Sequence, residues 1–430
     1  MRYLPIDNNL FKNNRKRFID LLPKNSVAIF LSNDQYPRNG DQFFPFRQQS
    51  DFFYLSGIDQ EKSILVIAPD ALNEKLREAI FLLVTNERIA TYDGHKYTRE
   101  EATEISGIEN AYWVDDFETS LRDVLQNAEH VYFNTIEYVK YYNEVPTRNI
   151  RFINEFKEKY PLYKLERAAP LLAKLRTIKS DIEIELLRKS CDITRKAFER
   201  VLRYTKPGVQ EFEVQAEIDH EFIINRANGH GYAPIIASGK NALVLHYIEN
   251  NDICKDGDLM LMDFGAEYAN YSADMSRTIP VNGKFTDRQK DCYNAVLRTF
   301  KAVRAFLIPG NTAKMVSEKA WGLMETEMIK LGLFTNEDVK NQDKEKPLVK
   351  KYFMHGTSHY LGLDVHDVGS YDEPIKPGMV FTCEPGIYIP EENIAIRIEN
   401  NILVTENGPV DLMENIPIEV EEIESMMNDR

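Results

Sequence analysis

The chain has 430 residues, of which 43% are hydrophobic and 28% are charged, and its formal net charge is −15. This length exceeds what one hydrophobic core usually serves, so we expect two globular domains. The negative charge argues against a nucleic-acid partner, because phosphate binding requires a basic surface.

Neither a membrane span nor an export signal is predicted. No apolar run approaches the ~18 residues that a spanning helix needs, and the first residues lack the apolar core of a signal peptide. The four cysteines are scattered without a CxxC pair and are predicted to be buried free thiols: Cys191, Cys254, Cys292 and Cys383. We therefore expect a cytoplasmic protein with no membrane partner.

The first part of the chain alternates apolar strands with amphipathic segments. Near-continuous hydrophobic runs are typical of buried sheet strands, and they occupy residues 26–32, 63–68, 79–84 and 130–134. This pattern predicts an α/β layer domain over residues 1–170. The aromatic-rich segment 43–57 suits a domain contact or a substrate rim, and ordinary core packing equally well. The run Arg15-Lys16-Arg17 indicates a solvated helix face.

A second domain is predicted over residues 171–430, beginning near Arg167-Ala168-Ala169-Pro170. Capping boxes at 180–183 and 286–289 open two helices that end before Pro207-Gly208 and Pro309-Gly310. Another helix follows each, the first over residues 211–228, and then an acidic hairpin. This repeated order indicates a diverged internal duplication, whose two halves would bring both hairpins to one centre.

The first acidic hairpin contains Asp263 and Asp274. An apolar run, residues 259–262, ends at Asp263, and the chain returns to Asp274. An even-numbered loop centred on Tyr268-Ala269 would place the two carboxylates directly opposite, with Cβ atoms ~4.5–5.5 Å apart. Such like charges are destabilising unless a cation lies between them. One hairpin alone could carry two acids by coincidence.

The second hairpin repeats the first in register. Residues 376–386 align with 255–265 at lysine, glycine, carboxylate and glycine, and Glu384 falls on Asp263. The chain turns through 390–393 and returns as an alternating strand, so Glu399 faces Glu384 and Arg397 shares its face. Two matching hairpins with two carboxylates each favour a metal site over coincidence.

Half of the 8 histidines lie next to these hairpins. His355, His359 and His366 belong to the segment 354–369, just before the second hairpin, and His246 precedes the first. A lone histidine is usually structural, whereas four beside four carboxylates indicate a functional site.

These residues carry a family resemblance. Asp263, Asp274, His359, Glu384 and Glu399 resemble the five-ligand set of the pita-bread metallopeptidases, family M24, which include methionine aminopeptidase, aminopeptidase P and prolidase. The segments 354–369, 384–388 and 396–400 are most similar to aminopeptidase P, the Xaa-Pro aminopeptidases, and residues 46–57 resemble the N-terminal domain of that group. The resemblance implies a two-domain protein in which a creatinase-like α/β domain precedes an α+β pita-bread catalytic domain with internal pseudo-two-fold duplication. It also implies a homo-oligomer, either a dimer or a tetramer.

Four carboxylates and one imidazole form a hard ligand set that suits Mn²⁺ and tolerates Co²⁺, Zn²⁺ or Fe²⁺. Five side chains exceed the needs of one zinc ion and suit two ions ~3.5–4 Å apart. The resemblance implies that Asp274 and Glu399 bridge the ions, that Asp263 binds one, and that His359 and Glu384 bind the other. A hydroxide shared by the ions would then attack peptides with proline second and release their first residue.

The remaining residues receive supporting roles. We expect Glu384 to shuttle a proton to the leaving amine, His246 and His355 to donate hydrogen bonds to the peptide carbonyl and tetrahedral intermediate, and His366 to line the cleft. Arg397 either orients Glu399 or binds substrate, or it only balances charge. The alternative functions are a prolidase, which cleaves Xaa-Pro dipeptides only, and a non-catalytic peptide-binding protein.

Overall fold

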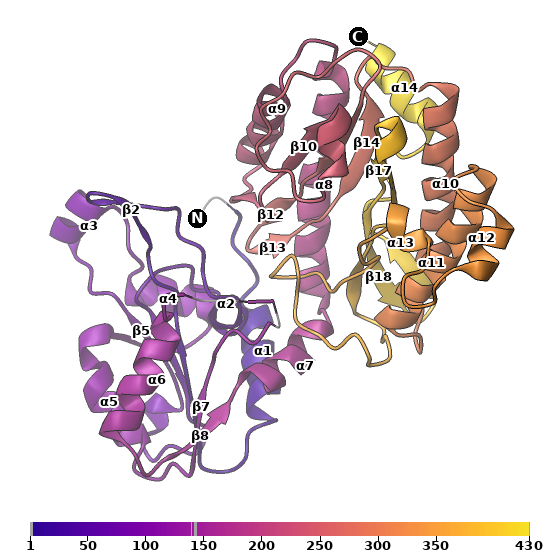
Figure 1. Cartoon of the computed structure of the whole chain (residues 1–430). Coiled ribbons are helices and arrows are strands. Elements are labelled where there is room, and N and C mark those ends of the chain that lie inside the picture. The colour runs from indigo at the N-terminus through magenta and orange to yellow at the C-terminus, as the bar shows by residue number, and fades with distance from the viewer. Residues whose placement is uncertain (1–2, 139, 142–143, 430) are drawn as a thin grey trace. The chain divides into compact units, whose positions relative to one another are not determined.

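The computed structural model describes residues 3–138, 140–141 and 144–429 (Figure 1). The chain divides into two compact units, Tyr3–Arg176 and Thr177–Arg430. The boundary predicted at residue 170 lies within helix α7 (Ala169–Thr177), and the compact units divide after Arg176. Within the described ranges, no helix combines the length and apolar character needed to cross a membrane.

The first unit is built on a six-stranded mixed sheet with strand order β6-β5-β4-β1-β7-β8. Strand β1 pairs antiparallel with β4 and parallel with β7. The strands are β1 (Ser26–Leu31), β4 (Ile64–Ile67), β5 (Glu78–Leu82), β6 (Asn110–Trp113), β7 (His130–Phe133) and β8 (Lys164–Arg167), and a separate hairpin is formed by β2 (Pro37–Asn39) and β3 (Gln42–Phe43). The four predicted strands are confirmed, whereas the short and half-buried β6 and β8 escaped prediction.

Helices cover both faces of this sheet. Alternate residues of β1, such as Val27 and Ile29, belong to one apolar cluster with Phe117 and Phe156. The intervening Phe30 packs edge-on against Phe18 from the opposite face. Besides α7 at its end, the helices of this unit are α1 (Asn9–Ile19), α2 (Ser50–Ser56), α3 (Glu87–Asp93), α4 (Arg99–Ser106), α5 (Phe117–Val124) and α6 (Arg148–Lys159), with single 3₁₀ turns η1 (Glu74–Leu76) and η2 (Val114–Asp116). The predicted α/β layer architecture is therefore confirmed.

Two local predictions for the first unit, the solvated helix face and the aromatic segment 43–57, hold only in part. Arg15 is not solvated: it is 1% exposed, and its guanidinium contacts Glu78 at 2.6 Å and donates to the Leu55 carbonyl at 2.8 Å. The aromatic segment divides in two, since the residues of α2 are buried core while Phe43 and Phe44 are exposed.

The second unit begins with the two predicted helix pairs. Capping boxes at Ser180 and Thr286 are both formed. Gly208 and Gly310, which follow the first helix of each pair, both have φ of +93°. The helices are α8 (Asp181–Tyr204), α9 (Glu211–Ile224), α10 (Asp287–Arg304), α11 (Ala313–Lys330), α12 (Asn336–Asn341), α13 (Val349–Tyr352) and α14 (Val420–Asn428). Helix α9 ends earlier than predicted, because Arg226 takes a left-handed conformation.

Short antiparallel sheets complete the second unit. Their orders are β10-β11-β14, β13-β12-β9, β15-β18-β19 and β16-β17. The strands are β9 (Gly229–His230), β10 (Ile235–Ser238), β11 (Leu259–Asp263), β12 (Ala266–Tyr268), β13 (Tyr271–Ser272), β14 (Ser276–Pro280), β15 (Val380–Cys383), β16 (Gly386–Ile389), β17 (Ile394–Arg397), β18 (Asn400–Thr405) and β19 (Gly408–Asp411), with 3₁₀ turns η3 (Gly239–Leu243) and η4 (Pro390–Glu392). All four cysteines are free and buried, as predicted.

The first hairpin has a different register from the predicted one. Tyr268 pairs with Tyr271, and Asp263 pairs with Ser276 instead of Asp274. The turn therefore lies at Ala269-Asn270, where φ is +53° and +64°. Positive φ at both central residues is characteristic of a type I′ turn, whose geometry matches the right-handed twist of the two strands that it joins. The shift is two residues, so Asp274 stays on the predicted face and lies diagonal to Asp263.

The second hairpin has the predicted register. Gly386 pairs with Arg397, and Cys383 pairs with Asn400. Glu384 and Glu399 fall opposite each other between these pairs, because both ladders share one register.

The two hairpins meet along β14 and β17. The Glu399 amide donates to the Ser276 carbonyl at 3.0 Å, and the Arg397 amide donates to Thr278 Oγ1 at 3.3 Å. This contact joins the duplicated halves and brings both pairs of acids to one place, as the sequence predicted.

Gly265 allows the first hairpin to close, which gives a first prediction. A Cβ at this position would lie 1.8 Å from the Ala273 carbonyl oxygen on the returning arm. Gly265→Ala is therefore expected to destabilise the protein by at least about 1–3 kcal/mol through backbone displacement. A thermal-unfolding midpoint several degrees below wild type would be observed in calorimetry.

Gly322→Ala is the matched control. Gly322 lies inside α11, and an added Cβ meets nothing within 4 Å. The substitution should stabilise by about 0.5–1 kcal/mol, because alanine is the better helix former. Equal effects of the two substitutions would contradict the described hairpin.

Candidate metal centre

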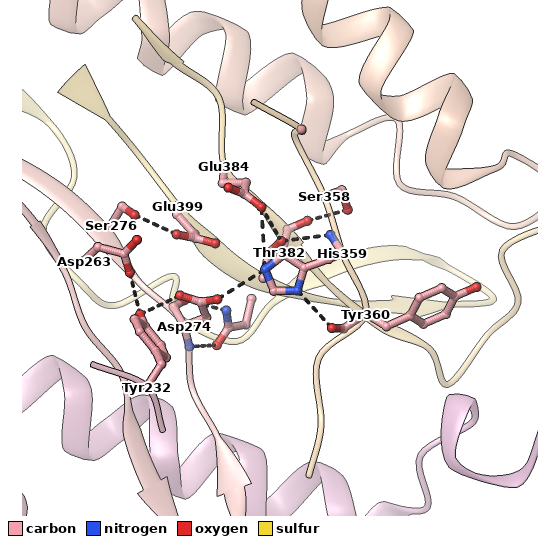
Figure 2. Close-up of polar contacts among 12 residues, drawn as sticks. Tyr232, Asp263, Asp274, Ser276, Ser358, His359, Tyr360, Thr382, Glu384 and Glu399 are labelled. Atoms are coloured by element: carbon pink, nitrogen blue, oxygen red, sulfur yellow. Dashed lines mark hydrogen bonds and ion pairs between the residues drawn. The ribbon is translucent and has the colours of Figure 1, made fainter. Parts of the chain in front are cut away.

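Three side chains from separate connecting segments form the core of the site: Asp274 lies between β13 and β14, Glu399 between β17 and β18, and His359 in the segment before β15. Asp274, His359 and Glu399 each offer one ligand atom, and these atoms all lie within 4.8 Å of one another. The three residues are 5%, 9% and 2% exposed. Figure 2 shows Asp263 and Glu384 beside this group, with all four carboxylates and the imidazole gathered around one centre.

His359 is oriented by its own segment. Residues 357–361 run alongside β15, since the Thr382 amide donates to the His359 carbonyl at 2.9 Å. His359 Nδ1 lies 3.0 Å from the Tyr360 carbonyl, which accepts its proton. Nε2 then faces Asp274 Oδ2 at 3.3 Å and Glu384 Oε1 at 3.6 Å. This arrangement leaves the Nε2 lone pair available for a metal ion.

Asp263 is joined to Asp274 through a tyrosine. The Tyr232 hydroxyl lies 2.6 Å from Asp263 Oδ1 and 2.6 Å from Asp274 Oδ1 (Figure 2). A hydroxyl has one proton and can donate to only one carboxylate at a time. The remaining close oxygen pair needs a proton or a cation.

Arg397 connects the two hairpins. Its guanidinium contacts Asp263 Oδ2 at 2.6 Å and donates to Ser276 Oγ at 2.8 Å. Ser276 Oγ in turn donates to Glu399 Oε2 at 2.7 Å. Arg397 thus forms an ion pair with Asp263 and reaches Glu399 through Ser276.

His355 lies between Glu384 and Tyr388. Its Nδ1 is 2.6 Å from the Gly356 carbonyl and 3.7 Å from Glu384 Oε2. Its Nε2 accepts from the Tyr388 hydroxyl at 2.9 Å, and Arg397 donates to the same hydroxyl at 2.7 Å. Burial and the charge of Arg397 lower the pKa of His355 to about 3, so this imidazole is neutral.

Crowding of buried acids dominates the electrostatics. Burial and the charge of Asp274 raise the pKa of Glu384 to about 7, although His359 opposes the shift. Burial and the charges of Asp274 and Glu384 hold the pKa of Glu399 well above its usual range. Burial lowers the pKa of His359, but its hydrogen bond to Asp274 and the charge of Glu384 outweigh this and raise it to about 9. The cluster therefore retains protons that a cation would replace.

Two further predicted residues, His366 and His246, are not among the cluster's acids and imidazole. The His366 ring stands perpendicular to the His359 ring, with centroids 4.4 Å apart. His246 is exposed, and its charge contributes to the lowered pKa of His355. The structure therefore brings the five predicted ligands together, with His355 next to Glu384 and His366 next to His359.

Sequence reasoning missed Tyr232, Ser276 and Tyr388. Ser276 and Tyr388 could have been predicted, because each lies an even number of residues from an acid on its own hairpin arm. Residues at even spacing along a strand share one face. Tyr232 had none, since it is far in sequence from both of its carboxylate partners.

Comparisons with known proteins match both units. Residues 185–406 match the sequence model of metallopeptidase family M24, and residues 11–132 match that of the aminopeptidase P N-terminal domain. The chain belongs to metallopeptidase family M24. The Xaa-Pro aminopeptidases of Haemophilus influenzae and Escherichia coli are 34% and 32% identical to it, each over 97% of both chains. Among solved structures, Escherichia coli aminopeptidase P with the inhibitor Pro-Leu has a TM-score of 0.88 and 31% identity over 99% of both chains.

This M24 chain is a metal-dependent aminopeptidase with the expected two-domain architecture. Its residues suit divalent ions on their own chemistry. The donor atoms are oxygens and one imidazole nitrogen, they converge from separate segments of the chain, and their proximity requires positive charge.

Removal of metal should therefore lower stability, which is the second prediction. Dialysis against a chelator should reduce the thermal-unfolding midpoint, and Mn²⁺ at about 100 times its Kd should restore about 2.7 kcal/mol. Asp274→Asn should unfold at a midpoint that no longer responds to Mn²⁺. A midpoint that ignores both chelator and metal in the wild-type protein would contradict the metal centre.

Proposed function

We propose that this protein is an Xaa-Pro aminopeptidase, which releases the first residue from peptides whose second residue is proline. The observation that carries the proposal is that Asp263 and Glu384 lie beside the Asp274, His359 and Glu399 group, together with the full-length similarity to Xaa-Pro aminopeptidases. Both units participate in that similarity, and the first matches a domain described for aminopeptidase P.

The charges in the centre favour two ions. Four carboxylates gather around one imidazole, and among the described residues Arg397 is the arginine that pairs with them. A metal-bound His359 must be neutral, so three formal negative charges would remain, which is more than one divalent ion neutralises. In our proposal the residues that would hold the two ions are Asp263, Asp274, His359, Glu384 and Glu399. Mn²⁺ suits this hard ligand set, with Co²⁺, Zn²⁺ or Fe²⁺ as substitutes.

When bound, such ions polarise the peptide carbonyl and lower the pKa of water toward neutrality. The protein side chains supply the rest. Glu384 carries a proton to the leaving proline nitrogen, which suits a carboxylate with one oxygen toward His359 and the other toward His355. His246 donates to the carbonyl oxygen, and its exposed ring is free to do so. His355 also donates to the substrate, once its Nδ1–H leaves the Gly356 carbonyl to which it is hydrogen-bonded in the free protein.

The surrounding residues keep this arrangement rigid. Arg397 fixes Asp263 directly and Glu399 through Ser276, so both carboxylates have defined orientations before substrate arrives. His366 forms part of the cleft wall next to His359. The cytoplasmic location and the dimeric or tetrameric state remain predictions from the sequence.

Substrate length distinguishes the proposal from a prolidase, which is the third prediction. Xaa-Pro-Xaa tripeptides should be cleaved with release of the first residue, measured by chromatography of the products with Mn²⁺ present. A tripeptide with alanine second is the matched control and should react much more slowly. Cleavage of Xaa-Pro dipeptides alone would support the prolidase instead.

Replacement of the proton carrier gives the fourth prediction. Glu384→Gln should lower kcat by about 10²–10⁴-fold, because it removes general acid–base catalysis. Glu391→Gln is the control, since Glu391 lies in the exposed turn of the same hairpin and pairs with Lys351. Its kcat should equal that of wild type. Substantial turnover by Glu384→Gln at unchanged metal content would show that another group carries the proton.

A further inference from the structure

A buried carboxylate outside the metal centre anchors one loop of the second unit. Glu211 is the first residue of α9 and is 0% exposed. Its Oε1 accepts from the Ser238 amide at 2.7 Å, Ser238 Oγ at 2.8 Å and Asn241 Nδ2 at 3.2 Å. Its Oε2 accepts from the Tyr247 hydroxyl at 2.7 Å and the Asp252 amide at 2.9 Å. These five donors exceed the roughly four lone-pair sites of one carboxylate, so Glu211 has no acceptor capacity left.

These donors all belong to the loop 238–252, and they lie on both sides of His246. The Glu211 amide also donates to the Asp252 carbonyl at 3.0 Å, which fixes the end of the loop. Asn250 ties that end to the start: its Oδ1 accepts from the Ile236 amide at 2.9 Å, and its Nδ2 donates to the Pro234 carbonyl at 2.9 Å.

Tyr247 links this anchor to the catalytic hairpins. Its ring packs in an apolar cluster with Leu261, Tyr388 and Ala395, which belong to β11, β16 and β17. Tyr247 is buried, whereas the preceding His246 is exposed. The side chain that Glu211 holds is therefore next in sequence to His246, to which the proposed function assigns the donor role.

We propose that Glu211 is a positioning residue for the hydrolytic reaction. It fixes the two ends of the 238–252 loop and the Tyr247 hydroxyl, and thereby holds His246 beside the metal centre. The reaction that it serves rests on the proposed function, whereas the anchoring of the loop is a property of the fold. Glutamine cannot replace it, because one amide oxygen cannot accept from five donors and the amide NH₂ would face some of them.

A double-substitution cycle tests this role, which is the fifth prediction. His246→Ala should lower kcat by about 10²-fold, the usual effect of losing one donor to the carbonyl oxygen. Glu211→Gln should lower kcat by roughly ten- to a hundredfold through displacement of His246, with KM nearly unchanged. In the His246→Ala background, Glu211→Gln should have almost no further effect. Full additivity of the two losses would overturn the proposal.

Two further variants separate positioning from folding. Tyr247→Phe removes one donor to Glu211 but keeps the ring in its cluster, so it should show a smaller loss of the same kind if Glu211→Gln does not fold. Glu213→Gln is the control, since Glu213 is on the same helix turn and accepts from the Gln210 amide at 2.7 Å, which the glutamine oxygen can also do. Its kcat should equal that of wild type.

Amide hydrogen exchange provides a readout independent of turnover. Glu211→Gln should accelerate exchange in peptides covering 238–252 and leave those of β15 and β18 unchanged. If the wild-type protein cleaves no proline peptide, the proposed function fails, and accelerated exchange confined to the loop still supports the anchoring of His246. Exchange in the loop that matches wild type would overturn the positioning role whatever the turnover.

Discussion

Repulsion among buried carboxylates is the constraint on which the second unit depends. Asp274 and Glu399 are close enough to His359 to bind one ion together with it, and Glu384 also faces His359. Asp263 and Asp274 both contact the Tyr232 hydroxyl. Burial makes each unpaired negative charge costly, and the raised pKa values of Glu384 and Glu399 express that cost. Divalent cations remove it, so metal binding and the closure of the two hairpins stabilise the same arrangement.

The surrounding protein is organised to hold these acids without neutralising them. Arg397 supplies one positive charge, and Ser276 and Tyr232 supply hydroxyl donors. The contact between β14 and β17 places carboxylates from both halves of the duplication at one point. Elsewhere in the unit, buried charged residues also have defined partners. Glu211 accepts hydrogen bonds from the 238–252 loop, and Lys179 forms a buried ion pair of 2.9 Å with Asp367, next to His366 in the sequence.

Much of this could be predicted from the sequence because the signals were local or repeated. Apolar runs gave the central strands of the first unit, and capping boxes gave α8 and α10. The register of the second hairpin followed from its alternating strand. The first register was wrong because its turn uses Ala269 at positive φ, which alanine rarely adopts. Arg15 was wrongly predicted to be solvated, and Tyr232 was not predicted at all. Their partners are distant in sequence, and only the folded chain brings them together.

Anomalous diffraction from crystals soaked in Mn²⁺ tests the central claim most directly. Our account predicts two manganese peaks about 3.5–4 Å apart, enclosed by Asp263, Asp274, His359, Glu384 and Glu399. Absence of any peak among these residues, with their side chains directed to separate places, would contradict it.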